Sequence, residues 1–177
     1  MRWGWALTGS GHFFTESLDL IRSLDAVDLF VSRAAAEVVR MYRTKLDLPS
    51  GTHIYRDTAA SAPPVGRFYE GIYHTLVIAP ATSNTVAKCV VGISDTLATN
   101  VFAQAWKCRV PAIVFACDSA PELTTAAPGG EVKVYPRRID LDNTARLGAF
   151  ERTRVVLSLD ELHAAIDARR ADLAGHG

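Results

Sequence analysis

The stretch that decides the fold is LVIAPATSNTVAKCVVGISDTLATN, residues 76–100. Its first residues form an apolar run that ends at Pro80, which is typical of a buried strand. Small hydroxyl and amide side chains follow the run directly: Thr82, Ser83, Asn84 and Thr85. A second polar group comes one helix later: Ser94, Asp95 and Thr96. Polar side chains placed immediately after a buried strand raise the expectation of a binding site at the strand end.

Outward from this stretch, the chain alternates strands with helices. We expect strands at 3–8, 27–32, 52–56, 75–79, 110–117 and 154–158, with an extended piece at 131–139. We expect helices at 13–24, 33–42, 83–92, 95–107 and 140–148, and a last helix that opens with a capping box at Ser158. The Pro-containing segment 61–66 predicts a break, and residues 118–130 predict a Pro/Gly-rich segment. The alternation predicts an α/β fold in one domain, 1–177: a three-layer, doubly wound parallel sheet, Rossmann-like or flavodoxin-like, with helices on both faces.

Composition narrows the class of protein. The chain has 177 residues, 49% of them hydrophobic and 21% charged, and a formal net charge of zero. Nothing in this balance indicates nucleic acid or a membrane as a partner. The three cysteines lack CxxC spacing and the histidines form no HExxH pair, so we expect no metal. With no recognisable signal peptide, reduced thiols point to the cytoplasm.

The residues just after each strand carry the functional signal, because parallel sheets bind ligands outside the carboxyl ends of their strands. These residues are Thr8–His12, Ser32–Arg33, Pro80–Thr85 and Cys117–Ser119. Glycines and hydroxyls there suit an anion held by backbone N–H groups and helix N-termini. Each of these signals has a simpler explanation when it is taken alone. Thr-Gly-Ser-Gly is neither a GxGxxG fingerprint nor a P-loop, so it could be a tight turn. Ser32, Thr82 and Asp95 could be helix caps. Because these polar residues occur together at several strand ends, the sequence favours a single binding site built from them.

The segments PATSNT and AKCVVGISDTLATN resemble the signature of the superfamily of homo-oligomeric flavin-containing cysteine decarboxylases. TGSG at 8–11 and SRAA at 32–35 also fit this pattern. WALTGSG, VSRAAAEVVRMY and VKVYPRRIDLDN are similar to the branch of archaeoflavoproteins and dihydromethanopterin reductases. The resemblance extends over nearly the whole chain.

The resemblance implies non-covalently bound FMN, no metal, and a homo-oligomer built from trimers. The residues that it assigns to FMN are Thr8, Gly9, Ser10, Gly11, Ser32, Arg33, Pro80, Ala81, Thr82, Thr85, Ser94, Asp95, Thr96 and Leu97. The last four belong to the part of the signature that reaches FMN across a subunit boundary.

The resemblance also implies an FMN-dependent oxidoreductase that reduces a dihydropterin of the dihydromethanopterin type by hydride transfer from reduced FMN. The electron donor is NAD(P)H or a redox protein. The catalytic candidates are Asn84 and His12, and further candidates for pterin or proton contacts are Asp118 and Tyr69. Phe13, Phe14, Phe68 and Tyr69 are candidates to cover a ring.

Two other functions stay open. One is an FMN electron carrier that takes electrons from a ferredoxin-like partner. The other is a decarboxylase of a cysteine-type substrate, which the chain fits poorly because the essential His of those enzymes is missing near Gly66.

Overall fold

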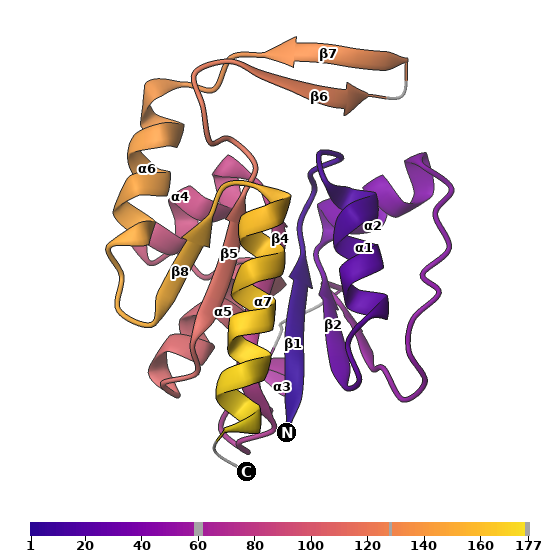
Figure 1. The fold of residues 1–177 in the computed structure, drawn as a ribbon, viewed down its shortest axis with the longest axis vertical. Coiled ribbons are helices and arrows are strands. Elements are labelled where there is room, and N and C mark those ends of the chain that lie inside the picture. The colour runs from indigo at the N-terminus through magenta and orange to yellow at the C-terminus, as the bar shows by residue number, and fades with distance from the viewer. Residues whose placement is uncertain (59–61, 128, 176–177) are drawn as a thin grey trace.

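The structure, a computed structural model, describes residues 1–58, 62–127 and 129–175 (Figure 1). The strands are β1 (Arg2–Leu7), β2 (Val27–Val31), β3 (Ile54–Arg56), β4 (Tyr73–Ala81), β5 (Ala112–Ala116), β6 (Leu123–Ala127), β7 (Gly130–Val134) and β8 (Thr153–Val156). The helices are α1 (Phe14–Arg22), α2 (Arg33–Met41), α3 (Ala62–Gly66), α4 (Ser83–Val91), α5 (Leu97–Lys107), α6 (Arg138–Gly148) and α7 (Leu159–Ala174). Among these residues, no helix has both the length and the apolar character required to cross a membrane.

Six strands form one sheet in the order β3-β2-β1-β4-β5-β8, and every neighbouring pair is parallel. The predicted doubly wound α/β fold is confirmed. The chain runs outward from β1 to β3, then returns to the middle of the sheet and runs the other way from β4. The direction therefore reverses between β1 and β4, which is where such sheets bind ligands.

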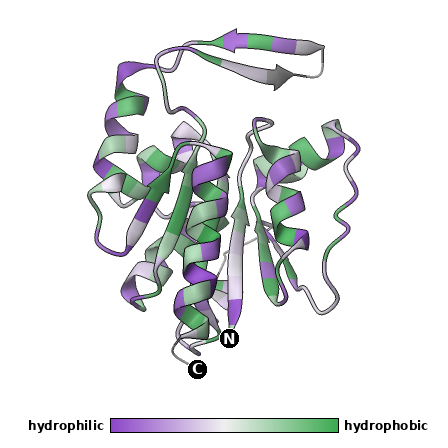
Figure 2. Ribbon diagram, in the orientation of Figure 1, coloured by the Kyte–Doolittle hydropathy of each residue, from purple (hydrophilic) through white to green (hydrophobic). Residues whose placement is uncertain are grey.

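Side-chain alternation along the strands divides the interior into two cores. Trp5 and Leu7 point to one face, where α1, α2 and α7 pack, while Ala6 points to the other face, covered mainly by α4 and α5. Strands buried on both faces are continuously apolar. Figure 2 shows hydrophobic residues along β4 and β5, while the helices carry both hydrophilic and hydrophobic residues.

A short helix, α3, occupies part of the segment predicted as a break, so that prediction was wrong for Ala62–Gly66; residue 61 lies outside the described residues. Both prolines, Pro63 and Pro64, stand in the first turn of α3. Proline is tolerated there because the first N–H groups of a helix have no intrahelical partner.

The segment after β5 contains a hairpin, β6–β7. The expected extended piece at 131–139 is confirmed over 131–134 by β7, but β6 was not predicted and residues 138–139 are in α6. Strand β6 pairs antiparallel with β7, from Leu123 opposite Val134 to Ala127 opposite Gly130. The hairpin does not join the main sheet; it extends over the carboxyl ends of the strands (Figure 1). The Pro/Gly-rich segment is therefore partly a strand, and its position makes it a cover for that edge.

Two helix starts also differ from the prediction. Thr96, not Asp95, caps α5, and its hydroxyl accepts a hydrogen bond from the Thr99 N–H at 3.2 Å. Helix α6 begins at Arg138 rather than at residue 140, because the Asp140 carboxylate accepts a hydrogen bond from the Arg137 N–H at 2.9 Å. The Ser158 cap of α7 is confirmed by its bond from the Glu161 N–H at 3.2 Å.

A buried carboxylate joins the amino ends of three strands. Asp28 on β2 is fully buried and accepts hydrogen bonds from Arg2 Nε at 2.9 Å, the Tyr73 hydroxyl at 2.9 Å and the His53 N–H at 3.2 Å. Burial alone would raise the pKa of Asp28, but the hydrogen bonds from Tyr73 and His53 and the charge of Arg2 outweigh it and lower the pKa. The folded structure therefore stabilises the charged form of Asp28.

Replacing Asp28→Asn is expected to lower the free energy of unfolding by about 3 kcal/mol at neutral pH, since it leaves the half-buried Arg2 guanidinium without its buried counter-charge. Because the folded-state pKa is lowered, the stabilisation is present above the unfolded-state pKa of about 4 and is lost as pH falls through the folded value. Urea unfolding across this pH range, at one protein concentration, measures both effects. The exposed Asp25→Asn variant is the control, and equal unfolding midpoints for the two variants would contradict the prediction.

Candidate active site

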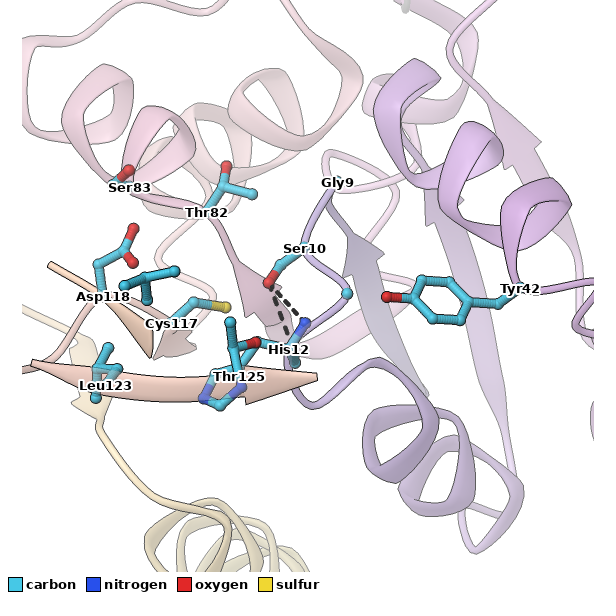
Figure 3. Close-up of a pocket in the computed structure, with 12 residues that line it drawn as sticks. Gly9, Ser10, His12, Tyr42, Thr82, Ser83, Cys117, Asp118, Leu123 and Thr125 are labelled. Atoms are coloured by element: carbon cyan, nitrogen blue, oxygen red, sulfur yellow. Dashed lines mark hydrogen bonds between the residues drawn. The ribbon is translucent and has the colours of Figure 1, made fainter. Parts of the chain in front are cut away.

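A cavity of about 390 Å³ opens at the reversal point between β1 and β4 (Figure 3). Its volume lies in the range of roughly 300–1,000 Å³ that is usual for small-molecule sites. The walls come from the loop after β1, the start of α4, the residues after β5, and the hairpin. The lining residues are Gly9, Ser10, Gly11, His12, Tyr42, Thr82, Ser83, Cys117, Asp118, Leu123, Thr125 and Val134.

The glycines of the β1 loop are required by close packing against α2 and the residue that follows it. A Cβ atom at Gly9 would lie 2.4 Å from the Cβ of Ala34, and one at Gly11 would lie 2.6 Å from the hydroxyl of Tyr42. Within the described part of the chain, the N–H groups of Gly9, Ser10 and Gly11 donate no hydrogen bond. The loop thus presents three backbone donors at the cavity, the chemistry that suits a bound anion.

Thr8 connects the two loops on either side of the reversal point. Its hydroxyl donates to the carbonyl of Pro80 at 2.7 Å and accepts from the Thr82 N–H at 3.0 Å. The residue is almost fully buried, and its hydroxyl is engaged by these two bonds. Thr8 therefore fixes the positions of the loops, and Pro80 takes part through its carbonyl oxygen.

The start of α4 contributes a second wall. The Thr82 hydroxyl accepts a hydrogen bond from the Thr85 N–H at 3.3 Å and lies 3.0 Å from the Thr85 hydroxyl. Thr82 is thus both a helix cap and a residue of the cavity, while Thr85 is buried behind it. Ala81 is fully buried, and its carbonyl accepts from the Cys117 N–H at 3.0 Å, which holds the β4 and β5 ends together. The positive end of the α4 dipole adds to the preference for an anion.

His12 is the titratable ring of this site. It is half-buried beside Phe13, with ring centroids 3.7 Å apart. Burial lowers the pKa of His12, and the carboxylates of Glu16 and Asp118 oppose that shift. Asn84, the other catalytic candidate, is exposed in the first turn of α4 and does not line the cavity. The structure therefore brings His12 and Asp118 together but leaves Asn84 outside.

Several other predicted cofactor residues lie along the same edge of the sheet, outside the cavity. Ser32 caps α2, with its hydroxyl 3.0 Å from the Ala35 N–H. Arg33 donates through Nε to the carbonyl of Asp57 at 3.0 Å, and the Asp57 carboxylate accepts from the Leu97 N–H at 3.1 Å. Asp57, which the sequence analysis missed, therefore links the end of β2 to the start of α5.

The 94–97 segment is separate from the cavity in a single chain. Ser94 and Asp95 are exposed, and Lys88 Nζ lies 2.8 Å from each carboxylate oxygen of Asp95. This hydrogen bonding lowers the pKa of Asp95. Thr96 caps α5, and the Leu97 side chain is fully buried. Their contact with FMN was predicted across a subunit boundary and stays a prediction.

The cavity also contains residues that the sequence analysis did not assign to a site. Tyr42 is the last residue of the helix predicted at 33–42; its hydroxyl forms no hydrogen bond within the described ranges and points toward the β1 loop (Figure 3). Leu123, Thr125 and Val134 come from the unpredicted hairpin. Burial raises the pKa of Cys117 to about 12, so its thiol is uncharged where it lines the cavity.

None of the candidate ring-covering aromatics lines this first cavity. Phe14 and Phe68 are in the core, and Tyr69 is 71% exposed and does not line the cavity. Phe13 is half-buried and stacks on Phe115 with ring centroids 4.8 Å apart. In the residues that the structure describes, no group of three His, Cys, Asp or Glu side chains is arranged to hold a metal ion.

Comparison with known proteins gives the family. The chain belongs to the Flavoprotein family, whose sequence profile matches residues 1–175. The resemblance inferred from the 76–100 stretch is thereby confirmed.

Two curated relatives are named dihydromethanopterin reductase (acceptor). The Methanosarcina mazei protein is 40% identical over 141 residues, which is 72% of this chain and 59% of that protein. The Methanocaldococcus jannaschii protein is 37% identical over 139 residues, 70% of this chain and 56% of that protein. The chain thus spans less than two thirds of the length of either relative.

One solved structure is similar over almost its full length. Burkholderia xenovorans DmrB, crystallised in complex with FMN and described as a cubic protein cage for redox transfer, is 49% identical to this chain. The TM-score is 0.87, and the match covers 98% of this chain and 97% of DmrB.

The packing of the β1 loop makes a direct prediction. Gly9→Ala should lower the free energy of unfolding by about 1–3 kcal/mol, because the new Cβ overlaps Ala34 and forces the loop away from α2. Gly66→Ala is the matched control, since a Cβ there meets no atom within 4 Å. Urea midpoints at one protein concentration compare the variants. A Gly9→Ala midpoint no lower than that of Gly66→Ala would contradict the described packing.

Proposed function

We propose that this chain binds FMN in the β1–β4 cavity and reduces a dihydropterin, as an FMN-dependent oxidoreductase of the dihydromethanopterin reductase type. The observation that carries the proposal is the set of unpaired backbone donors at Gly9, Ser10 and Gly11 beside the N-terminus of α4. The names of the two curated relatives and the FMN complex of DmrB support it.

The residues present fit FMN. The three loop N–H groups and the dipole of α4 would hold the phosphate, and Thr82 and Ser83 would contact the polar ribityl chain. Cys117, Leu123 and Val134 add the apolar surface that a flavin ring requires. When bound, FMN supplies hydride-transfer chemistry, while the protein provides orientation and electrostatics.

The reduction of a C=N bond by hydride also requires a proton at nitrogen. In this proposal an imidazole nitrogen of His12 holds that proton. The nearby Glu16 and Asp118 carboxylates favour the imidazolium form, while burial keeps the ring from retaining the proton too strongly. Asn84, exposed on α4, is left as a candidate contact for the part of the substrate outside the cavity.

Assembly into trimers belongs to the same proposal. The DmrB structure is described as a cubic cage, and cubic symmetry contains three-fold axes. In this chain, Val91, Ile93 and Trp106 are large exposed apolar residues, and Ile93 and Trp106 line the surface that also includes Ser94. An apolar surface beside the 94–97 segment suits the predicted contact of that segment with FMN of a neighbouring subunit.

A second candidate function is electron transfer without an organic substrate. DmrB is described as a cage for redox transfer, and the same cavity would serve a carrier that exchanges electrons with a redox protein.

Placement of the phosphate predicts the effect of a charge at residue 10. Ser10→Glu should expel FMN, because a carboxylate beside the loop N–H groups repels the phosphate and competes for its donors. Ser50→Glu, in an exposed turn, should keep FMN bound. The absorbance of dialysed protein gives the flavin-to-protein ratio. The placement fails if the Ser10→Glu protein keeps as much flavin as the control.

Reoxidation of the reduced protein separates the reductase from the carrier. We expect that FMN-loaded protein, reduced anaerobically, regains its flavin absorbance within one turnover when a dihydropterin is added. The expected product is the tetrahydropterin, in a ratio of one per flavin. A flavin that stays reduced with dihydropterin, but is rapidly reoxidised by a redox protein such as ferredoxin, would favour the carrier instead.

A further inference from the structure

A second cavity, of about 270 Å³, adjoins the first on the other side of His12. The two cavities share Gly11, His12 and Tyr42. The first turn of α1 and the outer part of the hairpin complete the second cavity, through Thr15, Glu16, Thr124 and Glu131. A ligand there would lie next to a cofactor held in the first cavity, with the His12 ring bordering both.

The second cavity is more acidic than the first, which has one carboxylate, that of Asp118. Two carboxylates line it and no Lys or Arg does, while the hydroxyls of its two threonines can donate or accept hydrogen bonds. Neither Glu16 nor Glu131 forms an ion pair or a hydrogen bond in the part of the chain that the structure describes. The β1 loop presents donors to an anion, whereas this neighbouring cavity presents carboxylates to a group that is rich in N–H donors.

We propose that the second cavity binds the 2-amino-4-oxopyrimidine edge of the dihydropterin, with the Glu16 carboxylate accepting hydrogen bonds from the ring N3–H and the 2-amino group. The inference rests on the proposed function. The two N–H groups of that edge are parallel and match the two oxygens of a carboxylate, as the N–H groups of a guanidinium do. The adjacent rings of His12 and Phe13 give the flat heterocycle an aromatic surface.

Glu16 is favoured over Glu131 by its position. It stands in the first turn of α1, a helix anchored in the core by Phe14, Leu18 and Ile21. Its negative charge acts on His12, so the carboxylate is close to the wall that both cavities share. Glu131 lies on the hairpin, which forms a separate two-stranded sheet. An acid in the first turn also stabilises a helix by about 0.3–1 kcal/mol, so the test has to separate binding from stability.

The test compares pterin with lumazine, two rings that differ at position 2, where pterin has an amino group and lumazine an oxygen. Calorimetry on the FMN-loaded, oxidised protein measures both dissociation constants without turnover. We expect the wild-type protein to prefer pterin by at least roughly tenfold, because lumazine places an acceptor against the carboxylate. In Glu16→Gln the preference should fall to one or reverse, because the amide offers one acceptor and one donor, which match the N3–H and 2-oxo groups of lumazine but not the two donors of pterin. The flavin-to-protein ratio should not change.

Two further variants make the result specific. Glu37→Gln, at an exposed position of α2 outside both cavities, should keep the wild-type preference. The Glu16→Asp variant retains a carboxylate, so it should bind pterin more weakly yet still prefer pterin to lumazine. If the Glu16→Gln variant does not fold, Glu16→Asp is measured in its place.

The outcomes distinguish this inference from the proposed function. A Glu16→Gln protein with an unchanged preference for pterin overturns the assignment of Glu16, as does a loss of preference confined to Glu131→Gln, while reoxidation by dihydropterin would still support the reductase. If the wild-type protein binds neither ring and dihydropterin does not reoxidise it, the proposed function fails and the inference fails with it.

Discussion

The hydroxyl of Thr8 is the contact on which the site depends. At the point where the strand order reverses, no peptide connects the loop after β1 to the loop after β4. The Thr8 hydroxyl makes the connection by donating to Pro80 and accepting from Thr82. The Thr8 side chain is buried, so the loss of either bond would leave a polar group in the interior without a partner. The loop that carries the glycines and the helix that carries Thr82 are thereby held at a fixed separation.

The chemical division of the site follows from this arrangement. The inner cavity has backbone donors from Gly9 to Gly11 and the N-terminus of α4 together with one carboxylate, Asp118, while the outer one has two carboxylates, Glu16 and Glu131. His12 lies between them. An anionic cofactor and a substrate with several N–H groups would therefore occupy adjacent positions without competing for the same protein groups. The hairpin covers both cavities, so β6 and β7 complete a site that the main sheet leaves open.

The fold was predictable because its strands are buried on both faces. The runs at Leu76–Ala79 and Ala112–Ala116 are continuously apolar, which identifies inner strands of a parallel sheet without any tertiary information. Caps at Ser32, Thr82 and Ser158 were predictable for a similar reason, since a cap depends on neighbours within one turn. The glycine loop could be located because its position directly after the first strand is itself a local signal.

The rest depends on contacts between distant parts of the chain. An extended piece was expected at 131–139, but β6 and its pairing with β7 were missed because the sequence LTTAA at 123–127 gives no apolar alternation, and the position of the hairpin over the cavity is a tertiary property. Asp57 carries no local signal for its bond to Leu97, which is 40 residues away. Tyr42 has the periodicity of a core residue, yet its hydroxyl faces the glycine loop. Asn84 was predicted to be catalytic because it lies in the PATSNT motif, although its position on α4 exposes it to solvent.

The most direct measurement is an experimental structure of the protein as purified, with its bound flavin. The account predicts density for a flavin whose phosphate accepts hydrogen bonds from the N–H groups of Gly9, Ser10 and Gly11, with the ring extending beneath the hairpin. A phosphate bound elsewhere on the chain, with those three N–H groups in contact with solvent only, would contradict it.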